Sequence, residues 1–112
     1  MATAVARKLD SIRQSGGIRA REIAQLLETT PQTVSRWRTG RSTPRPSSLT
    51  RLLRLEWLAS QLALVYPPDD ARIWLFSPHR DLNGERPVDL IADDRMDEVL
   101  VIIDRLQSAA YT

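Results

Sequence analysis

The stretch AREIAQLLETTPQTVSRWRTG, residues 20–40, decides the fold of the front half of this chain. Apolar residues recur in it at helical spacing on both sides of a break: Ile23, Ala24 and Leu27 before it, and Val34 and Trp37 after it. The break is the segment Glu-Thr-Thr-Pro at 28–31, which interrupts the helical pattern and then restarts it. Two short amphipathic helices joined in this way predict a helix-turn-helix, with the small Ala24 where the helices cross.

The second helix of this motif has clear boundary signals at both ends. Thr30 can accept a hydrogen bond from the first turn as the N-cap, and Pro31 suits the first helical position. Gly40 follows the last turn, and Pro44 and Pro46 lie beyond it, where they disfavour further helix. We therefore expect a helix over residues 31–39.

Helical periodicity continues through most of the chain, so we predict an all-α fold. The helix near residue 48 is capped by Ser47 or Ser48, and the last helix by Asp93 or Asp94. Residues 99–103 are rich enough in β-branched side chains to form a buried strand instead, and this alternative stays open. The expected helices cover residues 3–15, 20–28, 31–39, 48–66, 69–76, 87–92 and 94–110.

The long helix before Pro67-Pro68 connects the two parts of the chain. Its leucines cover more than one stripe, so we expect it to pack on two sides. We predict an N-terminal helix-turn-helix bundle at residues 1–66, which includes this connecting helix, and a small helical module at residues 67–112. Trp57 and Trp74 stand in apolar patterns, and we assign both to the core.

The composition excludes several classes of protein. The 112 residues include no cysteine, which rules out a disulfide framework and a thiolate metal site and is compatible with a reducing cytosol. No apolar run approaches the ~20 residues of a membrane span, and the N-terminus lacks the apolar segment of a signal peptide. We therefore expect a cytoplasmic protein without a membrane anchor.

No group of residues indicates catalysis, a metal or a cofactor. His79 is the only histidine, and no acidic or histidine ligand stands at helical spacing from it. Asp93-Asp94 is better explained as a helix cap than as an acid–base pair. Gly16-Gly17 lacks the lysine and hydroxyl residues of a phosphate-binding loop. We expect no enzymatic activity and no cofactor.

Charge divides the chain into two unlike halves. Residues 1–66 hold 11 basic and 4 acidic side chains, and residues 67–112 hold 5 basic and 10 acidic ones. The halves thus carry net charges of +7 and −5, which together give the total of +2. This asymmetry favours a polyanion as the partner of the front half and a protein as the partner of the back half. Chance partition in an arginine-rich chain is the alternative.

The outward face of the helix at 31–39 has side chains suited to reading DNA. Because Val34 and Trp37 face the core, the other side chains point outward or sideways. Gln32 and Arg36 are one turn apart and can reach base edges, where glutamine pairs with adenine and arginine with guanine. The candidates for phosphate contacts are Thr33, Ser35, Arg38, Arg41 and Arg45. These residues predict binding to operator DNA.

The back half contains the segment WLFSPHRDLNGERPVDLI at residues 74–91. This segment resembles the toxin-binding domain of Xre/MbcA/ParS antitoxins, in which Trp-Leu, Pro-Asn, Leu-Gly-Gly and Pro-x-Asp-Leu recur in this order before a terminal helix. An Xre-type helix-turn-helix in front is also the arrangement of that family. The resemblance therefore covers nearly the whole chain.

The resemblance implies a function and three partners. Members of the family are antitoxins of type II toxin–antitoxin systems whose toxins have the RES fold and destroy cellular NAD. They commonly form homodimers, repress their own operon and place their C-terminal segment at the entrance of the toxin active site. The implied partners are thus a RES-type toxin, operator DNA and a second copy of the chain. The alternative is a stand-alone helix-turn-helix transcriptional regulator whose C-terminal half is a dimerisation module.

The resemblance also implies which residues bind the toxin. Pro78, Gly84 and Pro87 restrict the path of the loop, and we expect Trp74 and Leu82 to anchor it from beneath. The nearby acids Asp81, Glu85 and Asp89 are expected to meet a basic rim on the toxin. The chain departs from the family pattern at His79, Asn83 and Ala109-Ala110, where asparagine, glycine and a glycine are usual. The candidate toxin-binding residues are Trp74, Pro78, His79, Arg80, Leu82, Gly84, Pro87, Asp89, Tyr111 and Thr112.

Overall fold

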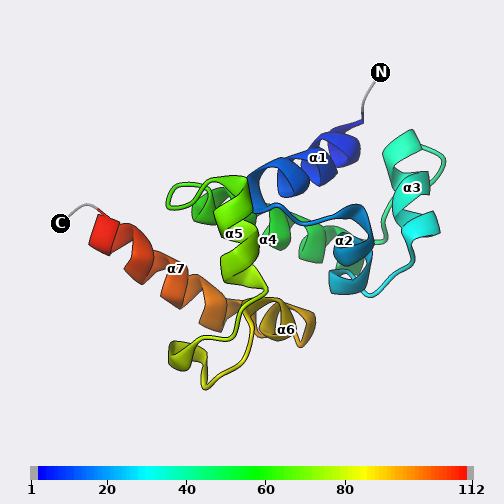
Figure 1. The fold of residues 1–112 in the computed structure, drawn as a ribbon. Helices are drawn as coiled ribbons and strands as arrows, with labels where there is room; N and C mark the ends of the chain where they lie inside the picture. The colour runs from blue at the N-terminus through cyan, green and yellow to red at the C-terminus, as the bar shows by residue number, and fades with distance from the viewer. Residues whose placement is uncertain (1–2, 111–112) are drawn as a thin grey trace.

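A computed structural model describes residues 3–110 as a chain of helices (Figure 1). Within this range no residue lies in a strand, so the predicted all-α fold is confirmed and residues 99–103 belong to a helix. None of these helices combines the length and apolar character needed to cross a bilayer. The elements are α1 (Ala4–Gly16), α2 (Ala20–Leu26), α3 (Pro31–Thr39), α4 (Pro46–Leu62), α5 (Pro68–Leu75), a 3₁₀ turn η1 (Arg80–Leu82), α6 (Pro87–Ala92) and α7 (Met96–Ala110).

The helix-turn-helix consists of α2 and α3, as the sequence predicts. Oγ1 of Thr30 accepts a hydrogen bond from the backbone N–H of Thr33 at 3.1 Å, which caps α3. Gly40 ends α3 with a φ of 79°, a left-handed conformation that glycine adopts without strain. Glu28 turns the chain between α2 and α3 with a φ of 55°, which is uncommon for a residue with a side chain.

Prolines place the start of two helices earlier than predicted. α4 begins at Pro46 with Arg45 as its N-cap, so neither Ser47 nor Ser48 caps it. α5 likewise begins at Pro68, one residue before the predicted start. The fixed φ of proline suits the first helical position, and its missing N–H is not needed there.

Three other helix ends were also predicted wrongly. α2 ends at Leu26, two residues before the predicted end at residue 28. α4 ends at Leu62, and the chain reaches Tyr66 through turns. α7 begins at Met96 because Asp94 has a φ of 61°, outside the range of a right-handed helix, so Asp94 belongs to the corner before α7.

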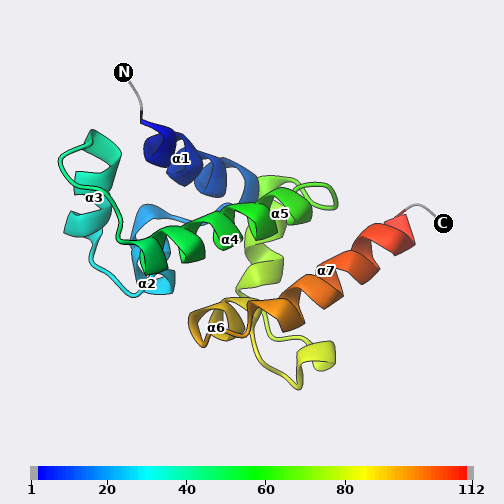
Figure 2. The same cartoon turned by 180° about the vertical axis from the view of Figure 1, so that it is seen from behind.

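One apolar core joins the two parts of the chain. α4 lies between α1 and α7 (Figure 2), and it packs against both of them. α1 also packs against α5, and α2 packs against α6. The prediction that the long helix buries two sides is confirmed. Because the buried side chains before and after residue 66 form one cluster, the division into 1–66 and 67–112 stays a proposal.

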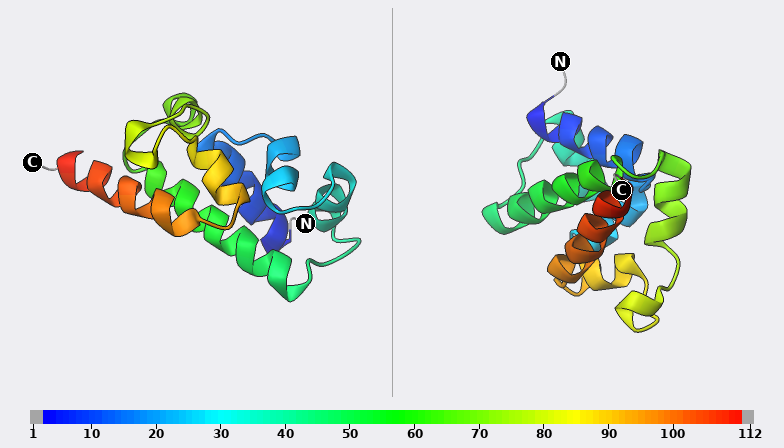
Figure 3. Two further views of the ribbon diagram at one scale, coloured as in Figure 1. Left: turned by 90° about the horizontal axis from the view of Figure 1, so that it is seen from below. Right: turned by 90° about the vertical axis from the view of Figure 1, so that its left-hand side faces the viewer.

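α7 has different neighbours on its two sides. α4 packs on one side of it and η1 packs on the other (Figure 3). The C-terminal end of α7 points away from the rest of the molecule (Figure 3). This arrangement separates the surface of α4 from the loop that contains η1.

The two tryptophans assigned to the core differ in their surroundings. Trp74 is buried in α5, as predicted, but Trp57 of α4 is 58% exposed. The prediction for Trp57 is wrong because Leu55, Leu58 and other core side chains occupy the two sides of α4 that face α1 and α7. Trp57 lies on a third side, which no element of residues 3–110 buries.

Candidate functional site

α3 exposes the side chains expected to read bases. Val34 and Trp37 are buried in the core, whereas Gln32, Ser35 and Arg36 are exposed on the opposite side. Gln32 and Arg36 are one helical turn apart on this outward face. The face therefore offers an amide and a guanidinium group, the two groups that pair with purine edges in the major groove.

Two of the predicted phosphate contacts make bonds within the chain. Nη1 of Arg38 donates to Oδ1 of Asp10 in α1 at 2.6 Å. Oγ1 of Thr33 lies 3.0 Å from Oγ1 of Thr30. Arg38 thus ties α3 to α1, and Asp10 partly neutralises its charge. The sequence analysis did not foresee this pairing, since the two residues belong to different helices.

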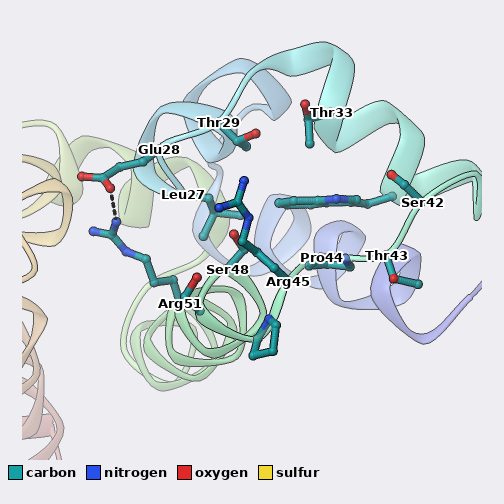
Figure 4. Close-up of a pocket in the computed structure, with 13 residues that line it drawn as sticks. Leu27, Glu28, Thr29, Thr33, Ser42, Thr43, Pro44, Arg45, Ser48 and Arg51 are labelled. Atoms are coloured by element: carbon teal, nitrogen blue, oxygen red, sulfur yellow. Dashed lines mark ion pairs between the residues drawn. The ribbon is translucent and has the colours of Figure 1, made fainter.

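A polar cleft of about 700 Å³ lies beside α3, between the α2–α3 turn, the loop before α4 and the first turns of α4 (Figure 4). Arg45 lines this cleft, and Arg51 reaches across it to Glu28, with 3.0 Å between Nη1 and Oε2. Arg36, Arg41 and Arg45 are exposed and make no ion pair with any residue in the range 3–110. Their charges remain available to a polyanion.

The α5–α6 loop, residues 76–86, is held together by His79. The carbonyl of His79 accepts hydrogen bonds from the N–H groups of Leu82 at 3.0 Å and Gly84 at 2.9 Å. Its own N–H donates to the carbonyl of Glu85 at 3.2 Å. Nε2 donates to the carbonyl of Trp74 at 2.7 Å, and since a carbonyl can only accept, Nε2 carries the proton. The loop therefore has a fixed conformation before any partner binds.

Several candidate toxin-binding residues lie beneath this loop instead of at its surface. Trp74 and Leu82 are buried, and the Trp74 ring centre is 5.0 Å from that of His79. Pro87 is buried as the first residue of α6. These side chains shape the loop from below. The loop residues that are exposed are Pro78, Arg80, Asp81, Asn83, Gly84 and Arg86.

Two of the three acids expected to meet the toxin are paired within the chain. Arg86 donates to both carboxylate oxygens of Asp89 at 2.8 Å, and these hydrogen bonds lower the pKa of Asp89. Arg95 donates to Glu85 at 3.3 Å. Asp81 is exposed and has no partner in the described part of the chain. The expected acidic surface is therefore smaller than the sequence indicates.

An ion pair that the sequence analysis missed joins α2 to α5. Arg72 donates to both carboxylate oxygens of Glu22, at 2.7 and 2.8 Å, and to the carbonyl of Gly17 at 2.8 Å. Its guanidinium carbon lies 4.5 Å from the ring centre of Phe76. The hydrogen bonds from Arg72 are the largest cause that lowers the pKa of Glu22. Since 50 positions separate Arg72 and Glu22, no local pattern could have predicted their contact.

The last two candidate toxin-binding residues follow α7 in the sequence. Tyr111 and Thr112 lie outside the described residues, and α7 is exposed over its last three residues, up to Ala110. In the range 3–110, no cluster of histidine, aspartate and glutamate side chains could hold a metal ion.

Both regions match known protein families. Residues 61–108 match the model of the antitoxin Xre/MbcA/ParS C-terminal toxin-binding domain, and residues 9–55 match a helix-turn-helix model. The mycobacterial cidal antitoxin MbcA of Mycobacterium bovis and of Mycobacterium tuberculosis is 34% identical over 95 residues, which cover 85% of this chain and 84% of the relative. A probable mycobacterial cidal antitoxin of Mycobacterium tuberculosis is 33% identical over 95 residues, covering 85% and 81%.

The fold also matches a solved structure. One chain in the crystal structure of the M. tuberculosis MbcT–MbcA toxin–antitoxin complex superposes with a TM-score of 0.83 and 30% sequence identity, over 98% of this chain and 99% of that one. A helix-turn-helix in front of a toxin-binding domain defines an antitoxin of the helix-turn-helix class and not an enzyme. The chain belongs to the Xre/MbcA/ParS antitoxin family.

Proposed function

We propose that this antitoxin binds and inhibits a RES-type toxin that degrades NAD. The observation that carries the proposal is the similarity over 98% of the chain to one chain of a toxin–antitoxin complex. The conformation of the α5–α6 loop supports it, because a loop already held by hydrogen bonds loses little conformational entropy when a partner docks.

The proposed toxin contacts are the exposed residues of this loop. Pro78, Arg80 and Gly84 meet the toxin directly, and Asp81 is the loop acid that is free to pair with a basic group. His79 positions the loop, while Trp74, Leu82 and Pro87 support it and Arg86 holds Asp89 in place. The loop therefore contributes shape and a few polar contacts, not a large acidic patch.

The C-terminal segment is proposed to enter the toxin's active-site cleft, with Tyr111 and Thr112 at its tip. The end of α7 points away from the body of the molecule, which leaves its last turn accessible to a partner (Figure 3). The last turn of α7 is exposed, so its removal takes little from the core.

Both the inhibition of the toxin and the role of the C-terminal segment can be tested by measuring how the antitoxin changes the rate at which the purified cognate toxin consumes NAD. The full chain is expected to form a complex and to stop turnover, and a chain lacking residues 109–112 is expected to bind but to inhibit weakly. Full inhibition by the shortened chain would remove the tail from the mechanism and leave the loop surface responsible. If the full chain neither binds nor inhibits, the chain is a stand-alone helix-turn-helix regulator instead.

We also propose that the antitoxin acts in the cytoplasm as a homodimeric repressor of its own operon. The exposed face of α3 supports binding to operator DNA, with Gln32 and Arg36 at base edges. Arg41 and Arg45, together with Thr33, Ser35 and Arg38, are assigned to the phosphates. The net charge of +7 on residues 1–66 favours a polyanionic partner.

Two arginine substitutions separate base reading from phosphate binding. Arg36→Ala is expected to relax the preference for one base, since its guanidinium faces the groove. Arg41→Ala is expected to weaken binding to every sequence and to reduce the slope of log affinity against log salt by about 1. Fluorescence anisotropy on operator and scrambled duplexes at several salt concentrations measures both. Equal loss on all sequences from Arg36→Ala would assign Arg36 to the phosphates.

A further inference from the structure

A groove with a volume of about 180 Å³ lies between α4 and the C-terminal half of α7. A water molecule occupies ~30 Å³ in the liquid, so the groove has room for a side chain but not for a helix. We call it the α4–α7 groove. The residues that line it are Trp57 and Gln61 of α4 and Leu100, Ile103, Asp104 and Gln107 of α7.

The groove combines an aromatic ring with an unpaired carboxylate. Trp57 is 58% exposed. Asp104 is also exposed, and its carboxylate makes no ion pair or hydrogen bond within residues 3–110. Arg105 does not line the groove, because successive positions on a helix point in directions about 100° apart. The groove therefore has a negative charge that no side chain of residues 3–110 neutralises.

The amides of the groove add a hydrogen-bond acceptor to this carboxylate. Nε2 of Gln107 donates to the carbonyl of Gln61 at 2.9 Å and to its Oε1 at 3.0 Å. Oε1 of Gln107 has no donor within residues 3–110. An indole face, a carboxylate and an amide oxygen together suit a cationic side chain, which can stack on the ring and donate to both oxygen groups.

The groove lies close to the chain end that is proposed to enter the toxin. Asp104 precedes Ala110 by six positions, which is about 9 Å along a helix. The end of α7 points away from the body of the molecule, and η1 and α4 pack on different sides of α7 (Figure 3). A cleft that admits the chain end has a rim all around it. One part of this rim would then face the α5–α6 loop and another part the α4–α7 groove.

We propose that the α4–α7 groove receives an arginine side chain from the rim of the toxin's cleft, with Asp104 as its counter-ion and Trp57 as the ring it stacks on. The inference rests on the proposed function, since the occupant belongs to the toxin. NAD contains two phosphates, and cationic side chains at a cleft raise the local concentration of an anionic substrate. Arginine fits the groove better than lysine, because its planar guanidinium stacks and forms ion pairs at the same time.

This contact extends the toxin-binding surface beyond the toxin-binding domain. The helix-turn-helix model ends at residue 55 and the model of the toxin-binding domain begins at residue 61, so Trp57 lies outside both. The long helix α4 would thus take part in toxin binding as well as in the core.

A second copy of the chain is a poorer occupant of the groove. Placing one groove on another brings two Asp104 carboxylates together without a cation between them. The charged side chains of α4 beside Trp57 are already paired: Glu56 with Lys8 at 3.3 Å, and Arg54 with Asp97 at 3.0 Å. The charge of the groove therefore favours a basic partner.

Toxin binding by Asp104→Asn tests the role of the charge. Asparagine keeps the size of the side chain and removes its charge, so the affinity for the purified cognate toxin is expected to fall about tenfold. The affinity of this variant should also depend less on salt than that of wild type. Arg105→Gln is the matched control, since it removes a neighbouring charge outside the groove, and it should not weaken binding. Titration calorimetry at two salt concentrations measures all three proteins.

Trp57→Ala tests the role of the ring. It is expected to weaken toxin binding about 3- to 30-fold. Leu53→Ala is its control, because Leu53 is 41% exposed one turn earlier on α4 and does not line the groove. The double variant of Trp57→Ala and Asp104→Asn should lose less than the product of the two single losses, because both residues hold the same cation. Sedimentation and circular dichroism of each free variant should match wild type.

The results that would overturn the proposal are specific to the groove. They are an Asp104→Asn variant that binds the toxin as tightly as wild type, and a double variant whose losses simply multiply. If Trp57→Ala and Leu53→Ala both lower the mass of the free antitoxin while Asp104→Asn leaves toxin binding unchanged, a second copy covers the groove instead. A wild type that does not bind the toxin would count against the proposed function itself, whereas the other results count against the groove alone.

Discussion

Gly17 and Gly84 have similar backbone conformations but different surroundings. Their φ values are 64° and 82°, both in the left-handed region. A Cβ atom added at Gly17 would lie 2.6 Å from the carbonyl oxygen of Pro68, whereas nothing lies within 4 Å of one added at Gly84. Gly17 is therefore required by backbone conformation and by the close approach of α5, and Gly84 is required by conformation alone.

Alanine substitution separates these two causes. Gly84→Ala is expected to lower the free energy of unfolding by about 1–2 kcal/mol, the usual strain of a left-handed residue with a side chain. Gly17→Ala is expected to cost about 3 kcal/mol or more, because a backbone carbonyl must also move. Urea unfolding of both variants gives the comparison. Equal losses would mean that α5 does not approach the α1–α2 corner this closely.

Among the structural elements, the α5–α6 loop is organised around one residue, through both its backbone and its side chain. It contains only the single turn η1, and His79 supplies both the backbone bonds that close it and the ring that reaches back to α5. The ring also packs against Trp74, which is buried. The order of the loop thus comes from its attachment to α5 and not from helical propensity.

His79→Ala is expected to loosen the loop without unfolding the molecule. Loss of the bond to the Trp74 carbonyl should speed hydrogen exchange at the Leu82 and Gly84 amides by about tenfold, which corresponds to about 1.4 kcal/mol of local stability. Asp81→Ala is the control, because the Asp81 side chain has no partner in residues 3–110. Unchanged protection in His79→Ala would show that the backbone alone holds the loop.

For the whole molecule, the ion pair of Glu22 and Arg72 connects the helix-turn-helix to the toxin-binding part. Both side chains are mostly buried, with 21% and 28% of their surfaces exposed. The bidentate pair and the third bond to the Gly17 carbonyl hold α5 against α2 and the α1–α2 corner. The two functional parts are therefore held in one orientation by polar contacts as well as by the shared core.

Acid is expected to weaken this connection. Because folding lowers the pKa of Glu22 below 4.5, the pair stabilises the fold fully above that pH, and its contribution falls as the pH drops through the folded pKa. Glu22→Gln should cost about 2 kcal/mol at neutral pH and progressively less in acid, measured by urea unfolding across pH.

The pair of Arg95 and Glu98 provides the comparison for this measurement. Hydrogen bonds from Arg95 also lower the pKa of Glu98, but this pair is exposed on the surface. Because water screens this pair, the loss in the free energy of unfolding caused by Glu98→Gln should depend less on pH than the loss caused by Glu22→Gln. If the difference in the free energy of unfolding between wild type and Glu22→Gln does not change with pH, the contribution of Glu22 is not electrostatic.

Much of the fold could be predicted because its signals are local. The cap at Thr30, the stop at Gly40 and the apolar spacing of α3 act within a few residues, and so the boundaries of α3 are correct. Asp89 and Arg86 stand at i and i+3, so their pairing could also have been inferred from spacing on a helix. The sequence analysis treats Pro46 as a residue that disfavours helix, although α4 begins at it.

The sequence by itself determined that this chain is helical, where the second helix of the helix-turn-helix begins and ends, and which segment forms the toxin-binding part. Periodicity, caps and motifs are properties of neighbouring residues, so they can be recognised without the tertiary structure. Only the tertiary structure decided which apolar face remains uncovered and which charges meet. Trp57 has the same helical pattern as its buried neighbours, and it is exposed because α1 and α7 leave one side of α4 open. Glu22 and Arg72 pair because packing brings α2 and α5 together, a contact that depends on the whole chain.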